Sequence, residues 1–218
     1  MDHPVSSPQS LDFFERARAR LSFKVPQSLT DADILPERGD YEAEPSLRMI
    51  ADVRPIRPAA VLIPVVAHPE PTVLLTKRTS HLSDHAGQVA FPGGRIDPED
   101  TTPLAAALRE AHEEIGLQPD FIEPIGYLDV YMTTRGYRIL PSLARVRPGF
   151  TLTLSPDEVE SAFEVPLSFL MEGANHQRHR YEWKGMMRSY YAMPFEDRYI
   201  WGITAGIVRD LYERIYRG

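Results

Sequence analysis

The short segment REAHEEIGL, residues 109–117, contains an arginine, a histidine and three glutamates. On a helix, Glu110 and Glu114 would project from one face, with Glu113 beside them. Like charges four residues apart repel by about 0.2–0.5 kcal/mol, and carboxylates near the end of a helix oppose its dipole. A bound divalent cation would compensate, because Mg²⁺ commonly links protein carboxylates to substrate phosphates. The spacing therefore predicts metal-assisted chemistry on phosphates, and a solvated charged face is the structural alternative.

The residues around this segment indicate where the helix begins and ends. Thr102 followed by Pro103 is a helix start signal, and Gly116 is a helix stop signal. We therefore predict a helix over residues 103–115. Its buried face is expected to be the apolar stripe Leu104, Leu108, Ala111 and Ile115.

Two glycines lie upstream of this helix, in the sequence Phe-Pro-Gly-Gly at residues 91–94. Because glycine has no side chain, the backbone at Gly93 and Gly94 can approach a metal ion or a phosphate closely. A tight turn is the structural alternative for such a pair taken alone. The glycine pair and the acidic helix, in this order, favour a single site for a metal ion and a phosphate.

Hydrophobic periodicity predicts the elements that must position these residues. Two β-rich runs form a hairpin-like arrangement, and amphipathic helices begin and close the chain. Strands interleaved with two or three helices predict the α/β or α+β class, with a mixed β-sheet covered on both faces. The predicted strands cover 59–67, 72–78, 122–131 and 137–146, and the terminal helices cover 9–21 and 199–216, the latter with Ile203, Ile207, Leu211 and Ile215 on one stripe.

Composition and charge limit the classes of function. Lys and Arg number 24 against 31 Asp and Glu, giving a net charge of −7, which argues against a general nucleic-acid surface. The absence of cysteine excludes disulfides and thiolate chemistry and favours Mg²⁺ or Mn²⁺ held by oxygen ligands. No apolar run has the length of a membrane span and the N-terminus lacks signal-peptide features, so we expect a cytoplasmic protein.

The acidic segment resembles the motif of the Nudix hydrolase family. The second half of that motif is Arg-Glu, an aliphatic residue, any residue, Glu-Glu, any residue and Gly, and it fits residues 109–116. In the first half, Gly94 stands one residue further from Arg109 than in the family. The family's first glutamate falls on Asp100 when counted from Gly94 and on Thr101 when counted from Arg109.

A second block, LLTKRTSHLSDHAGQVAFPGG at residues 74–94, resembles the signature of the coenzyme A diphosphatase branch of that family. Residues 57–65, 158–170 and 201–208 are similar to further segments of the branch. The resemblance implies a Nudix-type mixed β-sheet between helices, with a Nudix hydrolase domain at 56–218. An N-terminal helix and an irregular arm rich in Pro and acidic residues would occupy 1–55.

The resemblance also implies roles for individual residues. The catalytic group would comprise Arg109, Glu110, Glu113 and Glu114, with the three glutamates binding Mg²⁺ or Mn²⁺ and the arginine orienting them. The substrate-binding group would comprise Arg78, His81, His85, Gln88, Gly93 and Gly94. Three tyrosines are candidates for stacking on adenine, although strand aromatics are more often core residues: Tyr127, Tyr131 and Tyr137.

The implied reaction is metal-dependent hydrolysis of the diphosphate of coenzyme A, or of a derivative, to 4′-phosphopantetheine and adenosine 3′,5′-bisphosphate. The general base stays open between Glu113, Glu158 and Glu160. The alternatives are a Nudix enzyme acting on ADP-ribose, NADH or a nucleoside triphosphate, and a non-catalytic Nudix-like binding module. The expected partner is a CoA-like small-molecule nucleotide, with no nucleic acid and no membrane. The preferred form of coenzyme A and a homodimer both stay open.

Overall fold

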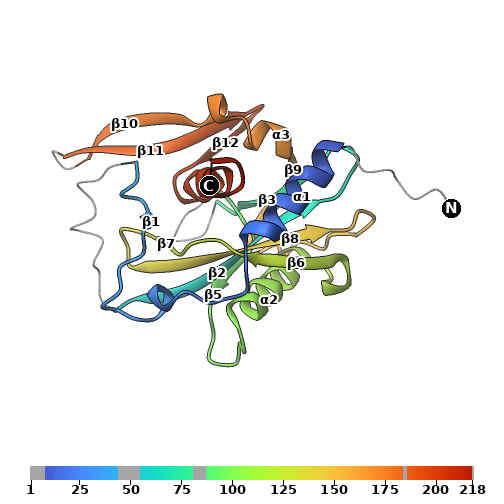
Figure 1. Ribbon diagram of the computed structural model, residues 1–218, viewed down its shortest axis with the longest axis horizontal. Coiled ribbons are helices and arrows are strands. Elements are labelled where there is room, and N and C mark those ends of the chain that lie inside the picture. Colours follow the sequence, from blue (N-terminus) through green and yellow to red (C-terminus); the bar gives the residue numbers. More distant parts are fainter. Residues whose placement is uncertain (1–7, 44–54, 81–86, 184–185, 218) are drawn as a thin grey trace.

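The computed structural model describes residues 8–43, 55–80, 87–183 and 186–217 (Figure 1). Its helices are α1 (Pro8–Arg20), α2 (Pro103–Ile115), α3 (Leu167–Leu170) and α4 (Ile203–Tyr212), which continues as a π-helical turn η5 (Glu213–Arg217). Three 3-10 turns are η1 (Gln27–Leu29), η3 (Pro119–Phe121) and η4 (Gly173–Asn175). The strands are β1 (Arg38–Gly39), β2 (Arg57–Val66), β3 (Thr72–Arg78), β4 (Val89–Ala90), β5 (Gly93–Arg95), β6 (Ile122–Tyr127), β7 (Tyr131–Met132), β8 (Tyr137–Val146), β9 (Val159–Pro166), β10 (Gln177–Trp183), β11 (Met186–Phe195) and β12 (Arg198–Trp201).

A large mixed sheet forms the centre of the molecule. Its main path runs β1-β7-β8-β2-β3-β4, while β5 pairs with β2, β6 with β8 and β9 with β3. Strands β2 and β8 run parallel from Arg57↔Tyr137 to Val66↔Val146. The predicted hairpin is confirmed, since β2 and β3 pair antiparallel next to their connection. Strands β10, β11 and β12 form a separate antiparallel sheet.

Both faces of the large sheet are covered, as Figure 1 shows, with α2 on one side and α4 on the other. Side chains alternate along β2, so Leu62 packs in the cluster that contains α2, whereas Ile63 packs in the cluster that contains α4. Because both faces of β2 are buried, its sequence is a nearly continuous apolar run. The predicted mixed sheet covered on both faces is confirmed.

Helix α2 has the predicted bounds and the predicted ends. The Thr102 hydroxyl accepts a hydrogen bond from the Ala105 N–H at 3.0 Å, and Gly116 ends the helix with a left-handed φ of 68°. The predicted buried stripe was partly wrong. Leu104 and Leu108 are only partly buried, and the fully buried positions include Ala106 and Ala107, whose small side chains let the helix pack closely on the sheet.

Two other predicted boundaries were wrong. The closing helix begins only at Ile203, because residues Arg198–Trp201 pair with β11 as β12 and Gly202 adopts a φ of 62°. The predicted strand 122–131 is interrupted after Tyr127, and β7 begins at Tyr131. Aromatic residues favour strands as well as helix faces, so periodicity alone did not separate these elements.

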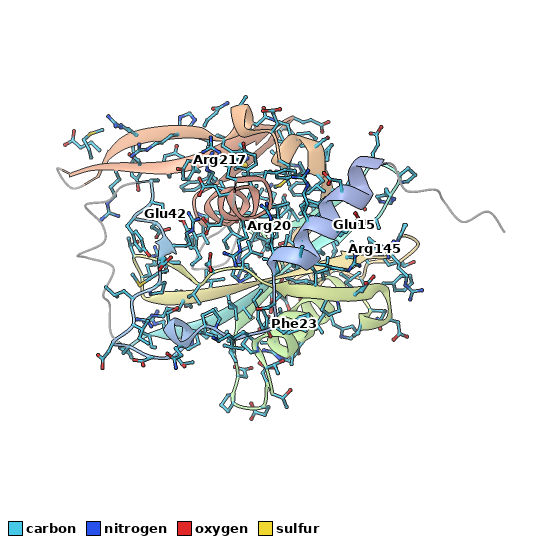
Figure 2. The ribbon with its side chains drawn as sticks, in the orientation of Figure 1. Glu15, Arg20, Phe23, Glu42, Arg145 and Arg217 are labelled. Carbon is cyan, nitrogen blue, oxygen red and sulfur yellow. The ribbon has the colours of Figure 1, made fainter. Side chains whose placement is uncertain are left out.

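The N-terminal segment packs on the same core as the sheet. Phe13, Phe14 and Ala17 of α1 are buried in one cluster with residues of α4. Figure 2 shows Arg20 at the end of α1, beside the C-terminal turns, where it donates to the carbonyls of Arg214 and Ile215 at 2.9 and 2.7 Å. The boundary at residues 55 and 56 stays a prediction. Within the described chain, no helix is long and apolar enough to cross a membrane.

Candidate active site

Glu114 is buried at the place where α2 packs against the strand that follows Phe91. Its side chain is 4% exposed, and its Oε2 accepts a hydrogen bond from the Gly93 N–H at 3.2 Å. The nearest cation is Arg78, whose Nη1 lies 3.5 Å from Glu114 Oε1. Burial, together with the charges of Glu110 and Glu158, raises the pKa of Glu114 to about 7. The carboxylate is therefore held where a further positive charge would stabilise it.

Glu110 lies directly against Gly94. A Cβ added at Gly94 would stand 2.4 Å from Glu110 Oε1, so the carboxylate occupies space that any other residue would fill. Arg109 Nη1 donates to Glu110 Oε1 at 3.0 Å. Burial raises the pKa of Glu110 despite this arginine. The glycine pair therefore places backbone beside both carboxylates of the acidic face.

Arg109 connects the helix to the loop after β5. Its Nε and Nη2 donate to the two carboxylate oxygens of Asp100 at 3.1 and 3.0 Å, and its Nη2 donates to the Arg95 carbonyl at 3.2 Å. These bonds lower the pKa of Asp100. Of the two candidates that the spacing left open, Asp100 and not Thr101 pairs with Arg109.

Glu113 is more exposed than the buried pair. Its side chain is 56% exposed and accepts from Arg109 Nη1 at 2.9 Å. Glu158 comes from another segment, and its charge contributes to the raised pKa of both Glu110 and Glu114.

The segment before β9 explains how Glu158 reaches the site. The N–H groups of Thr153 and Ser155 donate to the carbonyls of Ile115 and Glu114 at 2.9 and 2.8 Å, so this segment follows the end of α2. The Glu158 carbonyl then accepts from the Thr79 N–H at 3.1 Å, next to β3. These bonds also satisfy carbonyls that the end of a helix leaves open.

Glu160 lies apart from this group. Its Oε1 forms an ion pair with Lys77 Nζ at 2.7 Å, and its side chain is 45% exposed. Lys77 precedes Arg78 on β3, and the two side chains have different acidic partners, Glu160 and Glu114 respectively. Such an exposed pair contributes little to stability.

A cavity of about 480 Å³ opens beside the acidic site. The two glutamates do not line it, but Arg78, Gly93 and Gly94, which contact them, do. Its apolar floor and walls include Val61, Val89, Phe91, Ile139, Ile203 and Ile207. Gln88 lines this cavity and also a neighbouring one of about 270 Å³, whose walls include Tyr181, Tyr190 and Trp201.

The structure therefore brings together Arg78, Gln88, Gly93 and Gly94 of the predicted substrate-binding group. His81 and His85 lie outside the described residues. Of the three tyrosines, Tyr137 lines the larger cavity. The other two are buried, with the Tyr127 hydroxyl accepting from the Leu104 N–H and the Tyr131 hydroxyl donating to Asp40.

Sequence reasoning missed several residues of the cavity wall. Those with polar or aromatic side chains include Asp40, Arg57, Arg95, Arg135 and Trp201. They come from five separate parts of the chain. Arg57 and Trp201 begin two of the segments that resemble the coenzyme A branch, whereas the other three stand in no such segment. The parallel pairing of β2 with β8 places Arg57 beside Tyr137.

The donors fit a hard divalent cation in part. Glu110 and Glu114 are buried carboxylates with raised pKa values beside a glycine backbone, and such ions prefer oxygen ligands. Among the described residues, however, no three acidic or imidazole side chains converge as a formed ligand set. Glu113 instead pairs with Arg109.

Comparisons with known proteins show which family this chain is similar to. The model of the NUDIX domain matches residues 56–184. The chain is 44% identical over 156 residues to "Uncharacterized Nudix hydrolase NudL" of Escherichia coli, which covers 71% of this chain and 81% of that protein. The relative of the same name from Escherichia fergusonii has the same identity and coverage. Among solved structures, DR0079 from Deinococcus radiodurans is similar with a TM-score of 0.47 and 16% identity, over 76% of this chain and 88% of that one.

The family match spans more than half of the chain, and it includes both glycines and the whole acidic helix. The relatives are similar over most of their own length. This chain therefore belongs to the Nudix family and is a Nudix hydrolase.

Proposed function

We propose that this hydrolase cleaves the diphosphate linkage of coenzyme A, or of a derivative, to 4′-phosphopantetheine and adenosine 3′,5′-bisphosphate. The observation that carries the proposal is the position of the block at residues 74–94. Its described residues Arg78, Gln88 and Phe91 line the 480 Å³ cavity, and Arg78 also contacts the buried Glu114. The segment that resembles the coenzyme A branch thus borders the acidic site.

Glu110 and Glu114 are the residues that would hold a divalent cation, and Nudix hydrolases as a family use such ions. A bound ion would neutralise phosphate charge and lower the pKa of an attacking water. Glu113 is the third acid of the motif, and Arg109 acts as a positioning residue. Because Arg109 bonds to Glu110, Glu113 and the Asp100 carboxylate, it fixes the side from which Glu110 faces Gly94.

The chain's own groups supply the remaining functions. A water oxygen attacks one phosphorus, the bridging P–O bond breaks, and the leaving phosphate departs with its electron pair. The water proton needs an acceptor, and we assign this role to Glu158, because its charge acts on both Glu110 and Glu114 from another segment. Glu113 is occupied by Arg109. Glu160 is occupied by Lys77. No covalent intermediate is required.

Arg78 and the Gly93 backbone would bind the diphosphate. The guanidinium lies next to Glu114 and on the cavity wall, so it can contact a phosphate bound beside the acidic pair. Arginine provides planar, paired donors that match phosphate oxygens. Gln88 adds a polar side chain on the same wall.

The test is a substrate panel. The purified chain would be incubated with coenzyme A, acetyl-coenzyme A, ADP-ribose, NADH and dATP, each with Mg²⁺, with Mn²⁺ and with chelator, and products identified by mass. We expect metal-dependent release of 4′-phosphopantetheine and adenosine 3′,5′-bisphosphate from coenzyme A, faster than cleavage of compounds that lack pantetheine. Faster cleavage of ADP-ribose, NADH or dATP would instead establish the alternative, another nucleoside diphosphate derivative as substrate.

A matched pair of variants connects that activity to the site. Glu158→Gln should lower kcat by about 10²- to 10⁴-fold, the usual contribution of a general base. Glu160→Gln should leave kcat unchanged, since Glu160 only pairs with Lys77. Equal effects of the two substitutions would contradict the assignment of Glu158.

A further inference from the structure

Two arginines lie against one tyrosine on the wall of the larger cavity. Arg57, Arg95, Arg135 and Tyr137 all line it. The guanidinium carbons of Arg57 and Arg95 lie 5.4 and 5.9 Å from the centroid of the Tyr137 ring. Arg95 Nη2 also donates to the Tyr137 hydroxyl at 3.3 Å. The aromatic ring therefore holds two guanidinium groups close to each other.

The two arginines at Tyr137 come from neighbouring strands that also border the acidic site. Val61 of β2 pairs with Gly93, which contacts Glu114. Arg57 lies four residues earlier on the same strand, about 13 Å away, and pairs with Tyr137. Arg95 directly follows Gly94, which contacts Glu110. The two guanidinium groups therefore lie on the cavity wall beside the place where a diphosphate would bind.

Within the described part of the chain, Arg57 and Arg95 form no ion pair with a carboxylate. Asp97, the acid whose charge acts on Arg95, lies 3.5 Å from Arg109 Nη2. Two neighbouring guanidinium groups repel each other unless an anion lies between them. In a chain with a net charge of −7, this is a local excess of positive charge on a cavity wall.

We infer that Arg57 and Arg95 form a second anion site, which binds a phosphate of the substrate other than the diphosphate that is cleaved. The inference rests on the proposed function and deepens it. Coenzyme A carries such a group, the 3′-phosphate of its ribose, whereas ADP-ribose, NADH and dATP have no phosphate at the 3′ position. The fork of an arginine matches a terminal phosphate better than it matches a hydroxyl. The site would therefore be a determinant of substrate specificity.

The first test compares coenzyme A with 3′-dephospho-coenzyme A, which differs only in this phosphate. In Arg57→Gln and in Arg95→Gln, kcat/KM for coenzyme A should fall by about 10- to 100-fold, the usual effect of a lost charge-assisted bond. The value for 3′-dephospho-coenzyme A should change by less than about twofold. Arg16→Gln is the control for loss of one positive charge, because Arg16 forms an exposed pair with Asp12 on α1. Equal losses on both substrates, or no loss on either, would overturn the inference.

The second test does not depend on turnover. Calorimetric titration in chelator would compare adenosine 3′,5′-bisphosphate with AMP, which lacks the 3′-phosphate. The wild-type chain should bind the bisphosphate at least about 10-fold more tightly, and Arg57→Gln and Arg95→Gln should abolish this preference. Equal binding of both nucleotides by the wild type would refute the second anion site. If the preference is found but coenzyme A is not cleaved, the proposed function fails and the anion site stands.

Discussion

Gly94→Ala tests how closely the backbone must approach Glu110. The φ angle of Gly94 lies outside the left-handed region, so alanine fits the local backbone. The added Cβ would stand 2.4 Å from Glu110 Oε1, against the 3.4 Å at which ordinary van der Waals contact begins. The carboxylate must therefore move by about 1 Å. Because the obstacle is the end of a flexible side chain, the movement requires little change elsewhere.

The expected effect is on activity and not on stability. A misplacement of about 1 Å can lower the rate about 10²-fold, which corresponds to a barrier higher by about 2.8 kcal/mol. Replacing glycine by alanine at a compatible position changes the free energy of unfolding by at most about 1 kcal/mol. Gly94→Ala should therefore fold normally, lose about 10²-fold in kcat and bind Mn²⁺ more weakly.

Gly93→Ala is the matched control. Its Cβ would meet the Ala60 carbonyl oxygen at 2.4 Å, at a φ of 153°, and neither obstacle is a flexible side chain. This substitution should lower the free energy of unfolding by roughly 1–3 kcal/mol. The assays are kcat on the best substrate of the panel, Mn²⁺ titration and urea unfolding. If Gly94→Ala keeps its activity, the position of the Glu110 carboxylate against Gly94 is not needed for turnover. If Gly94→Ala is destabilised as much as Gly93→Ala, the added Cβ disturbs the fold and not only this carboxylate, which would also refute the reasoning.

Three further predictions concern single side chains. Because burial raises the pKa of Glu114 from 4.5 to about 7, its stabilising contribution is complete below pH 4.5 and is lost as the pH rises through 7. In chelator, the free energy of unfolding of Glu114→Gln, measured in urea, should therefore rise relative to that of the wild type by up to roughly 3 kcal/mol between pH 4.5 and 8. The same variant should lose orders of magnitude in activity. A difference in unfolding free energy that stays constant across this pH range would contradict the prediction. Asp100→Ala removes two hydrogen bonds to Arg109, so it should lower the free energy of unfolding in urea by about 2 kcal/mol and also lower kcat. Thr101→Ala should change neither quantity. Similar behaviour of the two variants would contradict the pairing of Asp100 with Arg109. Arg138 is fully buried and donates to the carbonyls of Ser28, Asp31 and Ile34. Arg138→Leu should therefore lower the free energy of unfolding by about 3–5 kcal/mol and expose residues 22–36 to limited proteolysis. An unchanged digestion pattern would show that Arg138 does not hold this segment in place.

Local signals predicted the acidic helix correctly, because its ends depend on neighbouring residues alone. Thr102, Pro103 and Gly116 act through hydrogen bonds and backbone angles within a few residues. The same locality explains why β2 and β3 were predicted as a hairpin. Where the sequence suited two structures, as between Tyr199 and Trp201, periodicity predicted a helix, but these residues pair with β11 as a strand.

The sequence by itself determined the family motif, the helix that carries Glu110 and Glu114, and the glycine pair. These features are contiguous in the chain, so their chemistry can be inferred from residue type and spacing. Only the tertiary structure decided that Asp100 pairs with Arg109, that Glu160 pairs with Lys77, and that Arg57 and Arg95 meet at Tyr137. Each of these depends on strand register or on a loop folded onto another element. Such long-range placement is fixed by packing, which no local pattern encodes.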